Sequence, residues 1–361
     1  MTGIRVMHVI SEMGTGGAES LVMEMVRRGP QVGWESAVAS GGGSRVSQLT
    51  AAGVPHFFVP VPRRSVRRVF GARMAVRRAV KSFNPDLVIA HNVSATGVTC
   101  SARLAVPLLT VFHGVSAPDY RNSARVLLLA SDRIVAVGGL IADRLRKAGI
   151  RVEVTVIRNA VTQPQPTCRS AAREVLNLPV DAPVALCLAR MEPQKRHDLL
   201  LDAWSQLSGN EILLLAGDGS LRPNLEQRAR NLGDRVRFLG TRSDVPTLLA
   251  AADVSVLTSD WEGLPMAILE SLSAGRPVVA TDVDGVREIL APGGGRLVPP
   301  GDARSVALAL REMLYDEAAR NEAASIGLST IEQFYDPVRM MQCYDEVIRQ
   351  MITTRDIACI P

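Results

Sequence analysis

Two glutamates eight residues apart are the first side chains whose type and spacing suggest chemistry. Glu262 and Glu270 flank Pro265, and a helix is expected to begin at about this proline because it lacks an N–H that would have no partner there. Eight helical residues turn by about 80° beyond two full turns, so both carboxylates should point to one side. Such a site offers hydroxyl acceptors beside a set of anion-binding amides, those of Gly263, Leu264 and Met266. The alternative is an exposed capping glutamate and a solvated helical one.

Two cations follow the first strand expected in the second half of the chain. Arg190 ends that strand, and Lys195 stands five residues later, where the next helix opens. A cation at a helix N-terminus opposes the helix dipole and so needs another reason to be there. An anionic ligand is such a reason, and the planar fork of arginine together with the point charge of lysine suits a diphosphate. The alternative is a pair of surface cations without a ligand.

A glycine-rich turn follows the first expected strand. Gly16 and Gly17 precede a helix expected to open at Ala18, and glycines there let backbone amides approach an anion. A dinucleotide-binding turn would need a third glycine in place of Glu19 and an acidic residue in place of Ser40, so NAD binding is disfavoured. No Gly-Lys-Ser/Thr follows, which excludes a P-loop. A plain tight turn remains the alternative to a phosphate contact.

Two histidines close neighbouring strands of the first half. His91 ends the fourth expected strand and His113 ends the fifth, at the edge where parallel sheets bind ligands. Both are therefore candidates for ligand contacts or proton transfer, with a structural role as the alternative. The other histidines are interpreted as structural: His8, His56 and His197. No Gly-x-Ser-x-Gly turn and no Cys/His pair is evident, so covalent hydrolase chemistry is not indicated.

The sequence indicates neither a metal site nor a disulfide framework. The five cysteines are scattered without a Cys-x-x-Cys pair, so they are expected to be reduced. Asp282 and Asp284 form an Asp-x-Asp sequence, but Asp284 precedes Gly285 and is explained as the N-cap of a helix that contains Glu288. A comparable strand end carries Gly217, Asp218 and Gly219.

Short β-branched runs alternate with helical patterns along the chain, which is typical of parallel sheets covered by helices on both faces. Strands are expected at 4–10, 35–40, 56–60, 86–91, 107–112, 133–138 and 154–158. After a linker at 162–167 they are expected at 184–189, 211–216, 236–239, 254–258, 278–281 and 296–298. From 303 to about 351 the pattern is helical only. The chain is therefore expected to be α/β, with two Rossmann-like, doubly wound domains facing a cleft where ligands bind.

Length and charge agree with two domains. The chain has 361 residues and 41 basic against 36 acidic side chains, with 21 basic and 9 acidic ones in residues 1–160. The first domain is thus basic and the second acidic. A content of 47% hydrophobic and 21% charged residues is that of an ordinary globular protein. No apolar run approaches the roughly 18 residues of a membrane span, and the first strand is too short for a secretory signal, so a cytoplasmic location is expected.

The basic surplus is concentrated in one segment of the first domain. Residues 63–81 hold eight basic side chains and no acidic one: Arg63, Arg64, Arg67, Arg68, Arg73, Arg77, Arg78 and Lys81. An amphipathic basic helix here could dock the protein on the anionic inner face of the plasma membrane. A solvated basic helix is the alternative. Nucleic acid is disfavoured as a partner because only Phe70 and Phe83 lie nearby to stack on bases.

Together these motifs resemble glycosyltransferase family 4, the retaining nucleotide-sugar transferases of the two-domain GT-B fold. The resemblance covers nearly the whole chain, and its most specific part is the pair Glu262 and Glu270 within Glu-Gly-Leu-Pro. Supporting positions are Gly-Gly-Ala-Glu at 16–19, His113 with Gly114, Asn159, Arg190 with Lys195, 217–219 and 274–279. One departure is Val283-Asp284-Gly285, where relatives often carry two glycines.

The resemblance implies an acceptor-binding domain at 1–162 and a donor-binding domain at 168–334. It also implies a final helix, about 335–361, that crosses back to the first domain. Arg190 and Lys195 would bind the donor diphosphate, helped by amides of Gly16 and of 263–266. They would stabilise the leaving diphosphate, whose own oxygen helps to deprotonate the acceptor, without a metal, another cofactor or a covalent sugar intermediate.

The same resemblance assigns the sugar and the base of the donor. Glu270 would hold the ribose hydroxyls and Glu262 those of the transferred sugar, which His113 would contact from the first domain. Donor-binding residues near the base and strand ends would be Gly217, Leu239, Gly240 and Arg242. His91 is a further candidate for a contact to the sugar or the acceptor.

The expected reaction is transfer of a hexosyl or N-acetylhexosaminyl group from a nucleotide-diphosphate sugar, with UDP favoured over GDP. The acceptor would be a hydroxyl group of a sugar, a lipid-linked molecule or a small molecule, in the assembly of surface polysaccharide, glycolipid or secondary metabolites. Two alternatives are a nucleotide-sugar epimerase of the same fold and a non-catalytic nucleotide-sugar binding protein. An epimerase would need acid and base carboxylates for inversion and would not require the two-glutamate helix.

Overall fold

The computed structural model describes residues 3–61 and 66–358, with the backbone alone at 66–68 and 355–358. The chain divides into two compact units. The first unit consists of Met1–Asn159 with Pro337–Pro361, and the second of Ala160–Asp336. The expected α/β chain with two doubly wound sheets is confirmed.

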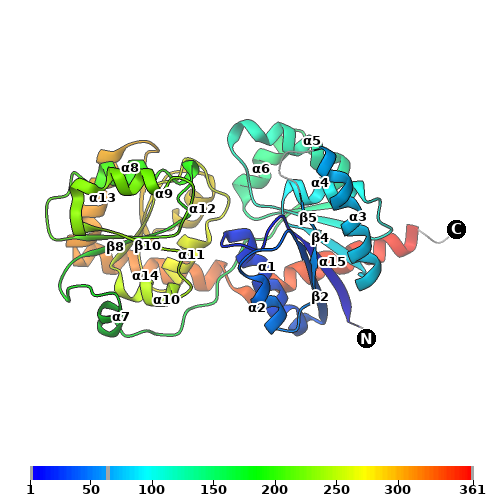
Figure 1. Ribbon diagram of the computed structural model, residues 1–361, viewed down its shortest axis with the longest axis horizontal. Coiled ribbons are helices and arrows are strands. Elements are labelled where there is room, and N and C mark those ends of the chain that lie inside the picture. Colours follow the sequence, from blue (N-terminus) through cyan, green and yellow to red (C-terminus); the bar gives the residue numbers. More distant parts are fainter. Residues whose placement is uncertain (1–2, 62–65, 359–361) are drawn as a thin grey trace. The chain divides into compact units, whose positions relative to one another are not determined.

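Among the described residues, seven parallel strands form the sheet of the first unit, in the order β3-β2-β1-β4-β5-β6-β7 (Figure 1). They are β1 (Ile4–Val9), β2 (Trp34–Ser40), β3 (His56–Phe58), β4 (Leu87–Ala90), β5 (Leu108–Phe112), β6 (Arg133–Ala136) and β7 (Val154–Val156). The chain builds outward from β1 to β3 and then crosses back to place β4 on the other side of β1. β4 and β5 are buried along their whole length, which explains their unbroken apolar sequences.

Helices cover both faces of this sheet. They are α1 (Gly17–Arg28), η1 (Gly29–Val32), α2 (Val46–Ala51), α3 (Val66–Phe83), α4 (Val93–Ser101), η2 (Ala117–Asp119), α5 (Tyr120–Ala130), α6 (Gly139–Lys147) and α15 (Pro337–Ala358). On one face α3, α4 and α5 lie side by side, and Val76 and Val98 join the core beneath them. On the other face Val22 of α1 and Leu49 of α2 form a second cluster. Each buried side chain of this size contributes about 1.5–3 kcal/mol.

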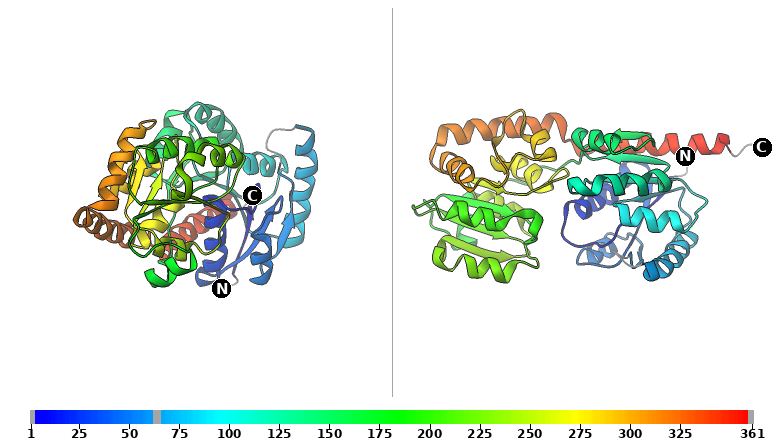
Figure 2. Two further views of the ribbon diagram at one scale, coloured as in Figure 1. Left: turned by 60° about the vertical axis from the view of Figure 1, so that its left-hand side comes forward. Right: turned by 90° about the horizontal axis from the view of Figure 1, so that it is seen from above.

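The last helix belongs to the first unit, although it follows the whole second unit in sequence. Trp34 donates its indole N–H to a carboxylate oxygen of Asp345 over 2.8 Å, and Arg349 donates to the backbone oxygen of Val32. Figure 1 and Figure 2 show α15, in red, lying along this unit. The expected return of the final helix to the first domain is confirmed.

Six parallel strands of the described chain form the sheet of the second unit, in the order β10-β9-β8-β11-β12-β13. They are β8 (Val184–Leu188), β9 (Ile212–Ala216), β10 (Val236–Gly240), β11 (Val254–Leu257), β12 (Val278–Thr281) and β13 (Gly295–Val298). The helices are α7 (Arg169–Val175), η3 (Pro193–Lys195), α8 (His197–Trp204), α9 (Arg222–Arg228), η4 (Arg230–Arg235), α10 (Val245–Ala251), α11 (Met266–Ser273), α12 (Asp284–Leu290), α13 (Ala303–Tyr315) and α14 (Glu317–Phe334).

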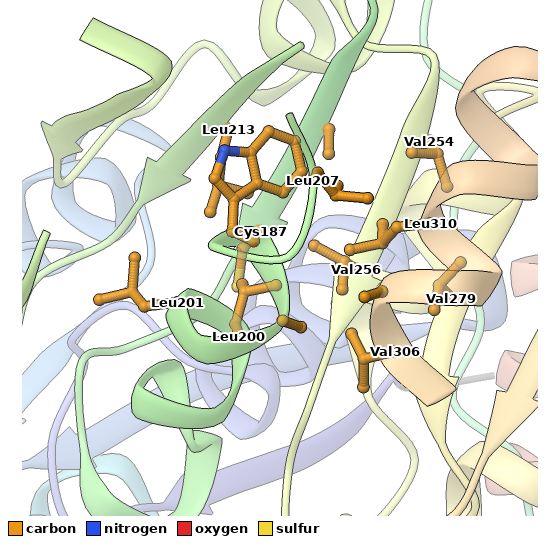
Figure 3. Packing of buried hydrophobic residues seen from close by; sticks show 14 of the residues in the cluster. Cys187, Leu200, Leu201, Leu207, Leu213, Val254, Val256, Val279, Val306 and Leu310 are labelled. Carbon is orange, nitrogen blue, oxygen red and sulfur yellow. The ribbon is translucent and has the colours of Figure 1, made fainter. Parts of the chain in front are cut away.

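The main core of the second unit packs α8 and α13 against one face of the sheet. Figure 3 shows Leu200 of α8 and Leu310 of α13 next to Cys187 and Val256 of the central strands. A second cluster, which includes Leu248 of α10, covers the other face. Burial on both faces explains why the strands of this sheet are apolar throughout.

The expected segments are found in place. All of the expected strands are present within two residues of their expected ends, and three helices, α13 to α15, fill the chain from Ala303 to Ala358 apart from short breaks. The proline-containing segment 162–167 has no helix or strand and is mostly exposed. Within the residues that the structure describes, no helix is long and apolar enough to cross a membrane.

Candidate active site

Glu262 lies in the turn after β11, where its side chain is buried. Only 8% of the residue is exposed. Its Oε1 atom accepts a hydrogen bond from Lys195 Nζ at 2.5 Å and another from Ser259 Oγ at 2.6 Å. Two residues that are 67 positions apart in the sequence therefore form one ion pair. The alternative of an exposed capping glutamate at this position is wrong.

The turn that carries Lys195 is bonded to the turn that carries Glu262. Thr258, the residue after β11, donates its hydroxyl to the backbone oxygen of Lys195 at 3.1 Å. The backbone N–H of Asp260 donates to the oxygen of Gln194 at 2.9 Å, and the Gln194 amide donates to the oxygen of Trp261 at 2.7 Å. These bonds fix the ammonium group at the carboxyl edge of the sheet, as expected for a ligand site in a doubly wound fold.

Arg190 stands two residues beyond the end of β8, with its side chain exposed. Its guanidinium group has no hydrogen-bond or ion-pair partner among the residues that the structure describes. The backbone beside it is held by the N–H of Met191, which donates to the oxygen of Asp218 at 2.9 Å. Gly217 has a φ of +146°, and a Cβ there would collide with the carbonyl oxygen of Ala189. Glycine is thus required at position 217, where the two strand ends meet. Arg190, beside it, is available to bind an anion.

The helix that follows Glu262 starts one residue later than expected. Pro265 is its N-cap and Met266 its first residue, so the helical N–H groups begin beyond the proline. Glu270 lies in the second turn and is half-buried. A Cβ on Gly285 would collide with the carbonyl oxygen of Gly263, so the first turn of α12 packs directly on the Glu-Gly-Leu-Pro segment. Because of this close approach, position 285 has room only for glycine.

The Asp-x-Asp sequence after β12 differs in one detail from its expected role. Val283 is the N-cap of α12, and Asp284 is the first helical residue, so the interpretation of Asp284 as the cap is wrong. An acidic residue in the first turn still favours the helix through its dipole. Asp282 pairs with Arg287, at 2.6 Å between Oδ1 and Nε. In the described part of the chain, no group of three His, Cys, Asp or Glu side chains could hold a metal ion.

The loop expected to face the nucleotide base carries an internal ion pair. Arg242 donates from Nε and from its terminal nitrogen to the two carboxylate oxygens of Asp244, at 2.7 and 2.6 Å. Gly240 has a φ of +65°, and its carbonyl oxygen accepts from the N–H of Gly217 at 2.8 Å. The guanidinium fork of Arg242 is therefore engaged by its neighbour, and the loop is joined to the strand end next to Arg190.

In the first unit, the glycine-rich turn caps α1. Gly16 is the N-cap, and the helix opens at Gly17, one residue before the expected Ala18. The carboxylate of Glu19 folds back over the α-carbon of Gly16, where it would collide with any Cβ. An acidic side chain therefore already lies at this helix terminus, and an anionic ligand would have to displace it.

Three histidines form a column at the carboxyl ends of β1, β4 and β5, with His8 and His91 fully buried and His113 partly buried. His8 and His91 are joined by a bond of 3.1 Å between Nδ1 and Nε2, with ring centroids 5.3 Å apart, and the rings of His91 and His113 are 6.3 Å apart. Burial lowers the pKa of His8 to about 3 and that of His113 to about 4, and it lowers the pKa of His91 well below its usual value. All three are neutral at pH 7, so they can exchange hydrogen bonds with hydroxyl groups but carry no charge. His8, interpreted as structural, stands at one end of this column, next to His91.

Two stretches of the sequence match known protein families. Residues 15–163 match Glycosyltransferase Family 4, and residues 182–316 match Glycosyl transferases group 1. The chain belongs to glycosyltransferase family 4. It is an enzyme that transfers a sugar from a nucleotide-sugar donor.

The relatives of this family 4 glycosyltransferase include enzymes of lipopolysaccharide core biosynthesis. LpsE of Rhizobium meliloti is 36% identical over 228 residues, which are 59% of this chain and 66% of the relative. LpsD of the same organism is 26% identical over 357 residues, 98% of this chain and 100% of the relative. The solved structure of HepE from Anabaena, in complex with UDP and glucose, has a TM-score of 0.85 at 23% identity and covers 96% of this chain and 100% of that chain. This likeness shows the GT-B fold.

This glycosyltransferase contains a buried Cys/His pair that was not predicted from the sequence. Cys187 Sγ lies 3.8 Å from His197 Nε2, so the statement that no such pair exists is wrong. Burial raises the pKa of Cys187 to about 12 and, with the charge of Lys195 nearby, lowers that of His197 to about 4. Both groups are therefore neutral, and the thiol is no nucleophile. The two residues come from a strand and the next helix, and neither shows a local sequence signal.

The cations of the basic segment 63–81 differ in their exposure where the structure describes them. Arg63 and Arg64 lie outside the described residues, as do the side chains of Arg67 and Arg68. Arg73 and Arg77 are half-buried, and Arg77 donates to the backbone oxygen of Ala102 at 2.7 Å, which caps the end of α4. The exposed cations of the described part of α3 are Arg78 and Lys81. They share a helical face with Phe70, which is 68% exposed, and with Met74.

Proposed function

We propose that the enzyme transfers a hexosyl or N-acetylhexosaminyl group from a UDP-sugar to a hydroxyl acceptor, with retention of configuration and without a metal ion. The observation that carries the proposal is the group of Arg190, Lys195 and Glu262 at the carboxyl edge of the second sheet. It combines an exposed cation that has no partner in the described part of the chain with a buried ion pair whose carboxylate lies four residues before the first residue of α11. This combination suits a ligand that carries both a diphosphate and hydroxyl groups.

In this proposal, Arg190 and Lys195 bind the diphosphate. The bond between the anomeric carbon and the phosphate oxygen breaks, and a bond from the same carbon to the acceptor oxygen forms on the same face. The acceptor's proton passes to the leaving diphosphate oxygen. Negative charge grows on that oxygen in the transition state, and two fixed cations stabilise it there.

Glu262 and Glu270 receive the hydroxyl groups of the donor. The diphosphate competes with Glu262 for Lys195, because the ammonium is already bonded to that carboxylate. Once released, Glu262 accepts hydrogen bonds from the transferred sugar while Ser259 remains bonded to it. Glu270, half-buried on α11, holds the ribose hydroxyls.

The choice of UDP rests on the solved relatives with this fold. HepE was solved with UDP, with UDP-glucose, and with UDP and glucose. In this chain the base would lie on the loop of Leu239, Gly240 and Arg242, and the pair of Arg242 with Asp244 stiffens that loop. Neutral His113, backed by His91, would donate to or accept from sugar hydroxyls in the first domain.

The acceptor is proposed to be a lipid-linked saccharide at an anionic membrane. The relatives named for lipopolysaccharide core biosynthesis and the exposed face of α3 support this, since Phe70 and Met74 there are accompanied by Arg78 and Lys81. Helix α5, which packs on α4 as α3 does, exposes Leu129 to 84%, one helical turn after the exposed Arg125. Apolar side chains with cations around them suit the interface of an anionic bilayer. The fraction of protein that co-sediments with vesicles containing phosphatidylglycerol should therefore decrease when salt is added and in the Lys81→Glu variant. Vesicle binding that changes with neither would refute the membrane contact.

The test of the reaction is product analysis with UDP-glucose and a panel of hydroxyl acceptors. The proposal expects a glycoside with the donor's anomeric configuration, formed in the presence of EDTA. An isomerised sugar from donor alone would show an epimerase instead. UDP binding without any transfer or donor hydrolysis would show a binding protein.

A further inference from the structure

Arg196, the residue after Lys195, has an unusual backbone and an unusual set of partners. Its φ of +50° and ψ of 46° lie in the left-handed region, which costs a residue with a side chain about 1 kcal/mol. It separates the short helix η3 from α8 and is the N-cap of the latter. A strained residue beside a functional group persists only where surrounding contacts hold it.

The side chain of Arg196 supplies such contacts. Its Nε and terminal nitrogen donate to Asp198 at 3.0 and 3.1 Å, and the other terminal nitrogen donates to Asp260 Oδ1 at 2.9 Å. Asp198 is in the first turn of α8, whereas Asp260 lies two residues before Glu262. One guanidinium thus joins the turn that carries Lys195 to the turn that carries Glu262. We refer to these three residues as the Arg196 bridge.

The backbone around the bridge depends on the left-handed turn. Thr258 donates to the oxygens of both Lys195 and Arg196, at 3.1 and 3.0 Å. The N–H of Asp260 donates to Gln194 one residue before Lys195. These bonds need the chain to reverse at Arg196, so a change of its φ would move Lys195 relative to Glu262.

We propose that Arg196 is a positioning residue for the diphosphate site, because it joins Asp198 to Asp260 and so holds the left-handed turn that places Lys195 against Glu262. The inference rests on the proposed function of Lys195. Arg196 does not touch the donor in this account, since its guanidinium is engaged by the two carboxylates. Its charge is neutralised locally and adds little attraction for an anion.

Two substitutions at Arg196 distinguish the effect of losing its side-chain bonds from the effect of strain in its backbone. Arg196→Gly removes the bridge but allows the left-handed turn without steric strain, whereas Arg196→Ala removes the bridge and keeps the strain. We expect the Kd for UDP to rise by about fivefold in the glycine variant and by more in the alanine variant. Arg196→Lys should not restore affinity, because one ammonium cannot reproduce the planar fork between two carboxylates.

Asp260→Asn is the deciding variant. If Arg196 acts through the bridge, this substitution weakens UDP binding as Arg196→Gly does. If Arg196 binds the diphosphate directly, loss of the acidic partner leaves the affinity unchanged or improves it, and the inference is overturned. Unchanged UDP affinity in Arg196→Gly, with only a lower melting temperature, would overturn it as well.

Two controls complete the experiment. Arg228→Ala breaks an exposed pair with Asp202 elsewhere in the same unit and should leave UDP affinity at the wild-type value. Lys195→Ala tests the proposed function itself. If Lys195→Ala loses UDP and the Arg196 and Asp260 variants do not, the bridge alone is refuted, whereas wild-type binding by Lys195→Ala refutes the site.

Discussion

Glu262 receives two donors on one buried oxygen, and this arrangement sets the order of events at the donor site. Lys195 and Ser259 both donate to Oε1, at 2.5 and 2.6 Å. In the proposed function, a diphosphate would have to take Lys195 away from Glu262 before the carboxylate could bind the sugar. The two groups proposed to bind the diphosphate and the sugar are thus paired with each other when no donor is bound.

Glu262→Gln tests this competition. A neutral amide holds Lys195 less strongly, so UDP should bind at least as tightly as to the wild type, while turnover falls by about 100-fold because the sugar loses its charged acceptor. Calorimetric titration with UDP and initial rates with UDP-glucose measure the two effects. Glu226→Gln, at an exposed helical glutamate of the same unit, is the control and should change neither. A parallel loss of UDP affinity and turnover in Glu262→Gln would contradict the shared ion pair.

The strands and helices of this enzyme were readable from the sequence because parallel strands are buried on both faces. β9, Ile212–Ala216, is five buried apolar residues in a row, and β12, Val278–Thr281, is buried throughout. Glu262, Lys195 and Arg190 could be placed at strand ends by counting along the same pattern. What could not be predicted depends on contacts between distant elements. Arg77 donates a hydrogen bond to the backbone oxygen at the end of α4, and the guanidinium group of Arg242 pairs with Asp244.

The ion pairs between α7 and Asp253, the residue before β11, are further contacts of this kind, made by Arg169 and Arg173. Arg173 is 2% exposed and donates to Asp253 Oδ2 at 3.0 Å, while the same oxygen accepts the N–H of Val184 at 2.8 Å. The Asp253 carboxylate thus joins α7 to the first residue of β8, at the edge of the sheet opposite the site. The sequence does not predict the pair of Arg173 and Asp253, because 80 residues separate the two partners.

Asp253→Asn should destabilise the second unit by about 3 kcal/mol, because it leaves a buried guanidinium without its counter-charge. Urea unfolding followed by tryptophan fluorescence measures the change, since Trp204 is buried in the same unit. Asp202→Asn breaks an exposed pair and should cost less than about 1 kcal/mol. Equal losses in the two variants would show that the buried pair is no more important than the exposed one.

The stability of the whole protein should depend on pH through its buried histidines. The pKa of His8 is lowered to about 3, and those of His113 and His197 to about 4, all by burial. Well above pH 6.5 the folded and unfolded forms both hold these side chains neutral, so these histidines add no pH dependence to the stability there. Between pH 6.5 and 4 the unfolded form binds protons that the folded form does not, which costs about 1.4 kcal/mol per pH unit for each histidine.

The melting temperature should therefore fall steadily as pH drops below 6.5. His113→Gln removes one of the protons taken up on unfolding and should make the fall less steep. A melting temperature that stays constant from pH 6.5 to 5 would contradict the burial of these imidazoles in neutral form.

The central claim is that the cation pair of the second unit binds the donor's diphosphate. Its most direct measurement is the Kd of Lys195→Ala for whichever of UDP and GDP the wild type binds more tightly, with circular dichroism to show that the variant is folded. The account predicts a Kd at least about tenfold higher than that of the wild type, because one charge-assisted bond to a phosphate is lost. A folded Lys195→Ala protein that binds the nucleotide with wild-type affinity would contradict it.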